Sequence, residues 1–356
     1  MAVAEETELD AEAAQAAVEY CYDKGWSDGL PLVPATPALV DRFLAHTARD
    51  PDEVIGRMDH LGRTCTVELA AVNAAMAGCL PEYFPVVLAA WEALLRDRAA
   101  KGGGWQSTSG PAPFIVVNGP IRHELGFNSA GGSLGPGFRA NATVARTIGL
   151  IIRNAFGIHP HVLDQATQGV PGRFSICIGE NEEESPWEPL ADEMGLEPGT
   201  SAVSATLTRS FEFVDNRHTQ DPEHVLNDFA DTISRIGPLI FGVQSCGVVF
   251  GPEHAQLLAK NGFSKADVKA WFVEHCVRTE ADLRRMGKDG IGPGGTGGRS
   301  ASPEERVPGD ELTKVIPTPA HVPIVVAGAK NAAMSMVYRI FGEWSNSSVP
   351  VERKSE

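Results

Sequence analysis

A glycine-rich stretch, Gly126 to Asn141, carries the residue types that bind small anions. Glycine lets the backbone approach a ligand closely and take positive φ angles. The stretch leads into a predicted helix, whose N-terminal N–H groups favour negative charge. Arg139 stands at the start of that helix and could hold a carboxylate or phosphate with two hydrogen bonds. The predicted substrate contacts are Asn128, Ser129, Gly131, Gly132, Ser133, Arg139 and Asn141.

The glycine spacing matches neither common nucleotide-binding motif. No Gly-Lys-Ser/Thr follows, as a Walker A loop requires, and the glycines do not fit GxGxxG directly after a strand. A purely structural Ω-loop is the alternative interpretation. Arg146 and Arg153 follow Arg139 at intervals of seven, on nearly one helix face, which also fits a solvated basic edge or packing of the arginine stems.

An acidic segment, Gly179 to Trp187, follows a predicted strand, where α/β folds usually place chemistry. Crowded carboxylates repel one another, so at least one should have a raised pKa and could act as a general acid or base. They could equally ligate a hard cation, or form a solvated turn. Glu180, Glu182 and Glu183 are the predicted catalytic carboxylates. Trp187, which we expect mainly to pack, is a further candidate substrate contact.

Two cysteines are candidate nucleophiles. Cys79 lies between two predicted helices, and a thiol at a helix N-terminus has a lowered pKa. The alternative is a small buried hydrophobe. Cys246 is the second candidate. His159 and His161 could supply two metal ligands, but the spacing suggests no third, so no metal site is predicted.

Composition narrows the class of protein. With 356 residues and a net charge of −16, the chain can bury a large core and is unsuited to non-specific nucleic-acid binding. The most apolar helical stretch is interrupted by arginines, and the acidic N-terminus does not resemble a signal peptide. Six widely spaced cysteines favour reduced thiols. We therefore expect a cytoplasmic protein outside the membrane.

The pattern of apolar runs predicts an α/β fold: a layered mixed sheet with flanking helices and a helical N-terminal region. The expected regions are 1–104, mainly helical; 105–330, an α/β catalytic core with a mobile loop or lid at 287–310; and 331–356, a C-terminal segment. Helices are predicted near 10–24, from 37, and at 66–78, 83–98, 139–156, 221–236, 252–261 and 265–276. Strands are predicted at 113–118, 173–179, 202–214 (one strand or two), 239–243, 247–250 and, as the last one, 323–328. No repeat of fixed period is evident.

Three long segments, Asn73 to Ala90, Val117 to Gly149 and Gly179 to Leu190, resemble an uncharacterised bacterial family, as do the shorter stretches at 251–254 and 262–268. Its members are associated with a small protein that bears a UGSC (Sec- or Cys-Gly-Ser-Cys) motif. The resemblance implies a partner with a reactive thiol or selenol, and hence a two-component enzyme. It implies no particular activity or cofactor. This chain lacks the UGSC motif, and residues 327–331 are less glycine-rich than in the family.

Together these features predict an oligomeric enzyme subunit that acts on a small anionic substrate, such as a carboxylate or thioester-like compound. The carboxylates would perform lyase or hydratase chemistry, or a thiol or selenol would assist a reduction with the small UGSC-type partner. The alternatives are a non-catalytic scaffold that shelters a reactive partner, and a metal-dependent hydrolase. The enzyme hypothesis requires that the glycine-rich and acidic segments line one cavity.

Overall fold

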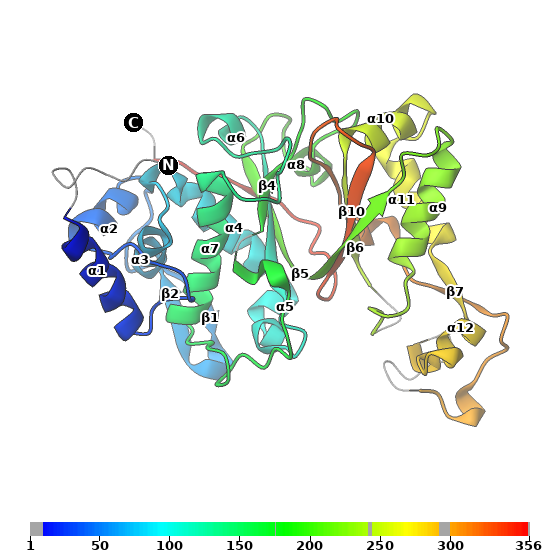
Figure 1. Cartoon of the computed structure of the whole chain (residues 1–356), viewed down its shortest axis with the longest axis horizontal. Coiled ribbons are helices and arrows are strands. Elements are labelled where there is room, and N and C mark those ends of the chain that lie inside the picture. The colour runs from blue at the N-terminus through cyan, green and yellow to red at the C-terminus, as the bar shows by residue number, and fades with distance from the viewer. Residues whose placement is uncertain (1–9, 175, 241–243, 292–299, 355–356) are drawn as a thin grey trace.

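A curled, seven-stranded mixed sheet with flanking helices forms the centre of the protein (Figure 1). The structure is a computed structural model, and it describes residues 10–174, 176–240, 244–291 and 300–354. The predicted α/β class is therefore confirmed. None of the helices in these ranges is long and apolar enough to cross a membrane.

The sheet has the strand order β4-β3-β5-β10-β6-β9, and β11 pairs with one end of β5. Two pairs of adjacent strands are parallel, namely β3 with β4 and β6 with β9. The other strand pairs of this sheet are antiparallel. The strands are β3 (Ala112–Asn118), β4 (Cys177–Gly179), β5 (Ala202–Asp215), β6 (Cys246–Phe250), β9 (Ile324–Val326), β10 (Met334–Ile340) and β11 (Val349–Pro350). β3 is buried along its whole length, as expected of an apolar run covered on both faces.

The two halves of the sheet have the same connectivity. In each half a strand (β3 or β6) is followed by helices, a parallel neighbour (β4 or β9) and an antiparallel strand (β5 or β10). Both first strands are followed directly by a Gly-Pro pair, Gly119-Pro120 and Gly251-Pro252, that leads into a helix. The halves meet at the antiparallel pair β5–β10. Segments of unequal length separate the equivalent strands, so the sequence shows no fixed period.

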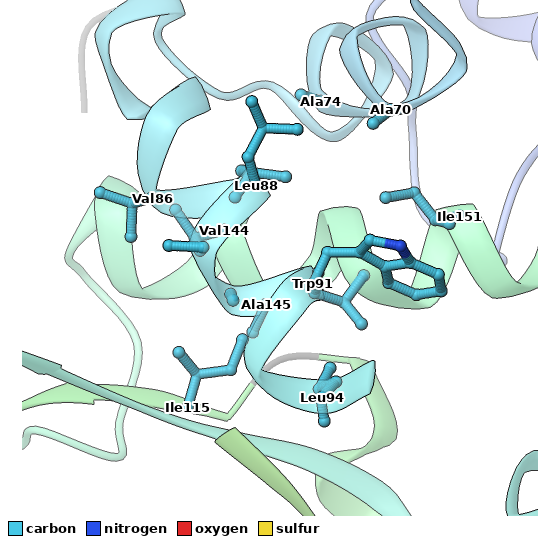
Figure 2. Close-up of a cluster of buried hydrophobic side chains, with 14 of the residues drawn as sticks. Ala70, Ala74, Val86, Leu88, Trp91, Leu94, Ile115, Val144, Ala145 and Ile151 are labelled. Carbon is cyan, nitrogen blue, oxygen red and sulfur yellow. The ribbon is translucent and has the colours of Figure 1, made fainter. Parts of the chain in front are cut away.

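Helices cover one face of the sheet in two groups (Figure 1). The first group packs on β3, β4 and β5 and consists of α3 (Val67–Ala77), α4 (Phe84–Arg96) and α7 (Arg139–Asn154). Figure 2 shows Trp91 and Leu88 of α4 gathered with Ile151 of α7 and Ile115 of β3. The second group packs on β6, β9 and β10 and consists of α9 (Pro222–Ile233), α10 (Pro252–Lys260) and α11 (Lys265–His275). The opposite face of the sheet, called here the inner face, carries Phe114, Val116, Phe211 and Tyr338.

Most predicted helices are confirmed to within about two residues at each end. Thr36 caps α2 and Ser264 forms the predicted capping box with Asp267. The remaining helices are α1 (Ala11–Asp23), α2 (Pro37–Leu44), α5 (Arg98–Lys101), α6 (Ile121–Glu124), α8 (Leu190–Glu193) and α12 (Glu280–Arg285). Short 3-10 helices lie at 59–61, 81–83, 103–106, 171–174, 289–291, 303–305 and 319–321.

Several strand predictions need correction. The strand expected at 173–179 is only the three residues of β4, because a 3-10 helix occupies 171–174. Residues 323–328 do not hold the last strand, since β10 follows and lies in the middle of the sheet. Two antiparallel strand pairs were not predicted: the hairpin of β1 (Val54–Met58) with β2 (Arg63–Thr66), and the pair of β7 (Val277–Thr279) with β8 (Leu312–Lys314), which a long segment separates. Residues 241–243 of the expected strand and 292–299 of the expected lid lie outside the described residues.

Candidate functional site

The glycine-rich and acidic segments lie side by side. The backbone N–H of Gly179 donates to the carbonyl of Asn128 at 3.0 Å. The side chain of Asn141 donates to the carbonyls of Asn128 (3.1 Å) and Cys177 (2.9 Å). These contacts use backbone and amide groups, so the two segments hold each other in place and leave few polar groups for a ligand.

Most predicted anion contacts are engaged within the protein. Asn128 is buried, and its side chain bonds the backbone of Ala130 and Gly131 at 3.0 Å each. Ser133 is also buried, while Ser129 is half-buried and its carbonyl accepts from Gly328 at 2.8 Å. The exposed positions are Gly131, Gly132 and Arg139. Arg139 begins α7, as predicted, and its Nε donates to the carbonyl of Gly78 at 2.9 Å.

Arg122, which the sequence analysis did not single out, engages Glu182 and Glu183. One Glu182 oxygen accepts from Asn118 (3.0 Å) and the Gly119 N–H (2.8 Å), and the other pairs with Arg122 at 2.9 Å. Glu183 pairs with Arg122 at 3.0 Å and lies 2.9 Å from His123. The Arg122 contact lowers the pKa of Glu183 to about 2. A carboxylate that stays charged and bonded to arginine is a poor proton carrier at neutral pH.

Glu180 is the acidic residue with the expected raised pKa, and burial is the main cause. It is 0 % exposed, and its carboxylate accepts from Asn118 at 2.7 Å and from the Leu190 N–H at 2.8 Å. The neighbouring Asn181 donates to the carbonyls of Val326 (2.7 Å) and Gly328 (3.0 Å). These residues therefore join the ends of β3, β4 and β9.

Trp187 packs in the core, as mainly expected, and its role as a substrate contact stays a prediction. Its ring lies edge-on to Phe250 at 5.6 Å, and its Nε1 donates to the carbonyl of Phe263 at 3.1 Å. The rigid Ser-Pro-Trp-Glu-Pro segment thus anchors the acidic loop to the second helix group.

The cysteines do not have the electrostatics predicted for a nucleophile. Cys79 is buried beside Thr147, 3.3 Å from its hydroxyl, and burial raises the pKa of its thiol, opposite to the predicted lowering. The physical reason is that loss of water around the thiolate outweighs the nearby donors. Cys246 is the first residue of β6 and also has a raised pKa. The other buried thiols with raised pKa values are Cys21, Cys65, Cys177 and Cys276.

Arg146 and Arg153 of α7, and the two histidines that follow this helix, lie away from its start, where Arg139 is placed. Arg146 pairs with Asp28 at 2.8 Å, and Arg153 donates to the carbonyl of Gly25 at 3.2 Å, so both hold the N-terminal turn. His159 and His161 follow the far end of α7, about 24 Å from its start for a 16-residue helix. In the described ranges, no group of three or more His, Cys, Asp or Glu side chains could hold a metal ion.

A cavity of about 720 Å³, which was not predicted from the sequence, lies on the inner face of the sheet. Leu134 is the one residue of the glycine-rich loop in its lining; no residue of 179–187 belongs to it. Among the lining residues in the described part of the chain, Arg209 carries the one ionisable side chain. The apolar lining residues are Leu134, Val170, Ile176, Phe211 and Met336; Thr108, Ser109, Thr167, Gln168 and Ser210 add polar groups.

One wall of this cavity depends on a close approach of two backbone segments. Thr167 donates to the carbonyl of Thr108 at 2.8 Å, and Val170 to that of Gly110 at 2.9 Å. Gly110 has a φ of 56°, and a Cβ there would lie 2.6 Å from Gly169 Cα. Only glycine therefore allows this wall to form without strain.

Arg209, a lining residue of the cavity, lies in a β-bulge. Arg339 of β10 pairs with Ser210, but the next residue, Ile340, pairs with Thr208, so Arg209 is the extra residue in β5. Bulges redirect side chains and are frequent beside active sites. The Arg209 guanidinium donates to the carbonyl of Pro238 at 3.0 Å and makes no ion pair within the described residues. Burial, together with the positive charge of Arg339, lowers its pKa.

Comparison with known proteins adds no further assignment. No family model matches the chain, and no curated protein sequence gives a significant match to it.

Proposed function

We propose that this chain is the substrate-binding subunit of a cytoplasmic enzyme that acts on a small organic anion, such as a carboxylate or thioester-like compound. The observation that carries this proposal is Arg209, a lining residue of the 720 Å³ cavity that makes no ion pair in the described part of the chain. Cavities of about 300–1,000 Å³ with apolar walls and a few polar groups are typical small-molecule sites. The anion bonds Arg209, and the apolar body contacts Phe211 and Met336.

The charges around Arg209 favour an anionic ligand. Arg209 and Arg339 both contribute, after burial, to the lowered pKa of Lys288, so three cations lie close together. Glu212 pairs with Arg339 at 2.8 Å and neutralises only one of them. An anion at Arg209 would reduce the remaining repulsion, which is worth more in a partly desolvated site than in water.

The reacting group is proposed to come from outside the cavity. None of the described residues in its lining is a carboxylate, histidine, lysine or cysteine. The cysteines of the chain are buried, with raised pKa values. A thiol or selenol of a small partner, as the UGSC-family resemblance implies, would supply what the cavity lacks. In the alternative scaffold hypothesis, the chain shelters that partner and binds no substrate.

Acid–base chemistry at the acidic loop, of the lyase or hydratase type, is a second candidate function. The raised pKa of Glu180 favours it, because a carboxyl with a raised pKa keeps its proton to a higher pH and can act as a general acid. In this mechanism Glu180→Gln abolishes turnover while the protein stays folded. Full activity of that variant would exclude it.

The binding affinity of the protein for 2-naphthoate, a small aromatic carboxylate, tests the proposal. Arg209→Met should weaken naphthoate binding about tenfold or more, because it removes a charged hydrogen-bond donor, and Arg209→Lys should retain part of the affinity. The matched control is Arg217→Met, since Arg217 is an exposed arginine that pairs with Asp215 and lies outside the cavity lining. Equal affinities in the Arg209→Met and wild-type proteins would overturn the proposal. If Arg209→Met leaves turnover by the reconstituted two-protein complex intact, the scaffold hypothesis is favoured.

A further inference from the structure

A second cavity, of about 470 Å³, shares a wall with the inner-face cavity, because residues 168–171 line both. Its other walls come from α7, from the segment that follows α7, and from the N-terminal turn at Asp28. The proposed function does not use this cavity.

Three arginines line the second cavity, and two of them are neutralised. Arg146 pairs with Asp28 at 2.8 Å, and Arg173 pairs with Asp164 at 2.7 Å. Arg153 makes no ion pair within the described residues. Its Nη2 donates to the carbonyl of Gly25, while its Nε–H is buried and has no acceptor in the part of the chain that the structure describes.

An unsatisfied buried donor costs about 1–3 kcal/mol. Arginine binds carboxylates and phosphates through two parallel hydrogen bonds, so a small reorientation of Arg153 would let an anion satisfy Nε and one Nη together. The positive charge of Arg153 also affects a neighbouring histidine. The pKa of His159 is lowered mainly by burial, and then by the charges of Arg153 and Arg63.

The other lining residues indicate the chemistry of the rest of the ligand. Trp105, Ile152, Ile158 and Phe174 are apolar, and Phe174 is 48 % exposed at the surface. We propose that this cavity is a second binding site for a small organic anion with an apolar body, held by Arg153 separately from the anion at Arg209. Arg153 thus has a binding role beyond its contact with the N-terminal turn.

Calorimetric titration with 2-naphthoate separates the two sites. The wild-type protein should bind two molecules per chain, and Arg153→Met and Arg209→Met should each bind one, with the affinity of the lost site reduced about tenfold or more. Arg217→Met, which lines neither cavity, should bind two. Arg153→Lys keeps the positive charge and should retain the second site with lower affinity. Thermal melts of each variant show that it is folded.

The outcomes for the two proposals are distinct. One site per wild-type chain, lost in Arg209→Met and unchanged in Arg153→Met, would overturn the second site and leave the proposed function standing. One site that is lost only in Arg153→Met would support the second site and overturn the proposed function. If Arg153→Met lowers the melting temperature but still binds two molecules, Arg153 only holds the N-terminal turn and the inference is wrong.

Discussion

Asn181 donates its backbone N–H to the carbonyl of Val326 at 2.7 Å and so connects the two edge strands of the sheet, β4 and β9. This bond reflects the curl of the sheet, because the outermost strands of an open, flat sheet would not meet. Glu180, next to Asn181, has its carboxylate buried at the same junction and accepts bonds from Asn118 and Leu190. The acidic loop therefore has a structural role that is independent of any catalytic one.

Replacing Glu180 by Ala should destabilise the protein by about 2–4 kcal/mol, because the buried donors of Asn118 and Leu190 lose their acceptor. Glu180→Gln tests the charge alone. The pKa of Glu180 is raised in the folded state. Its contribution to the free energy of unfolding is therefore present at low pH and is lost as the pH rises through the folded-state pKa. Urea denaturation between pH 4.5 and 8 should show this loss in the wild type and a smaller one in Glu180→Gln. The same pH dependence in both proteins would contradict a buried, titrating Glu180.

Arg122 should be important for stability, because its removal leaves two acidic side chains without their cation. Arg122→Met should lower the free energy of unfolding by about 2 kcal/mol, less than for a fully buried pair, since Glu183 is 54 % exposed. The Glu183 pKa of about 2 is below its unfolded value, so its contribution is present above that value and lost as the pH falls toward 2. Acid denaturation should therefore be less steep in Arg122→Met. Arg217→Met, which removes an exposed pair, should change stability by less than about 0.5 kcal/mol.

Gly110 should tolerate no side chain, whereas Gly25 should tolerate one. Both have positive φ, but a Cβ at Gly110 meets the Gly169 backbone and a Cβ at Gly25 meets nothing within 4 Å. Gly25→Ala should cost about 1–2 kcal/mol, from backbone strain alone. Gly110→Ala should cost more than that and should also weaken naphthoate binding, since it displaces a cavity wall. Equal melting temperatures for the two variants would argue against the close approach of the two segments.

The cysteines should be unreactive in the folded protein. All six are free and buried, and burial raises the pKa of Cys65, for example, to about 12. A thiol reagent such as dithionitrobenzoate should label fewer than one thiol per native chain and all six after unfolding in urea. Rapid labelling of Cys79 in the native state, abolished in Cys79→Ser, would restore it as a candidate nucleophile.

Features that depend on neighbouring residues were predicted well from the sequence. The apolar spacing of α3 and α4, the Thr36 cap and the Ser264–Asp267 capping box all act within one or two helical turns. The hairpin β1–β2 was missed because its stability comes from a distant residue: Trp91 of α4 donates to the carbonyl of Ile55 at 3.0 Å and covers the hairpin.

The amino-acid sequence by itself determined the α/β class, most helices and the acidic and glycine-rich loops, because periodicity, capping and turn residues are local signals. Only the tertiary structure decided what those loops do: Glu180 is buried and Arg122 holds Glu182 because strands far apart in the chain meet at one edge. The position of Arg209 was likewise not predictable from the sequence. Arg209 lines the cavity at a bulge that exists only in the register between β5 and β10, and no spacing within β5 encodes that register.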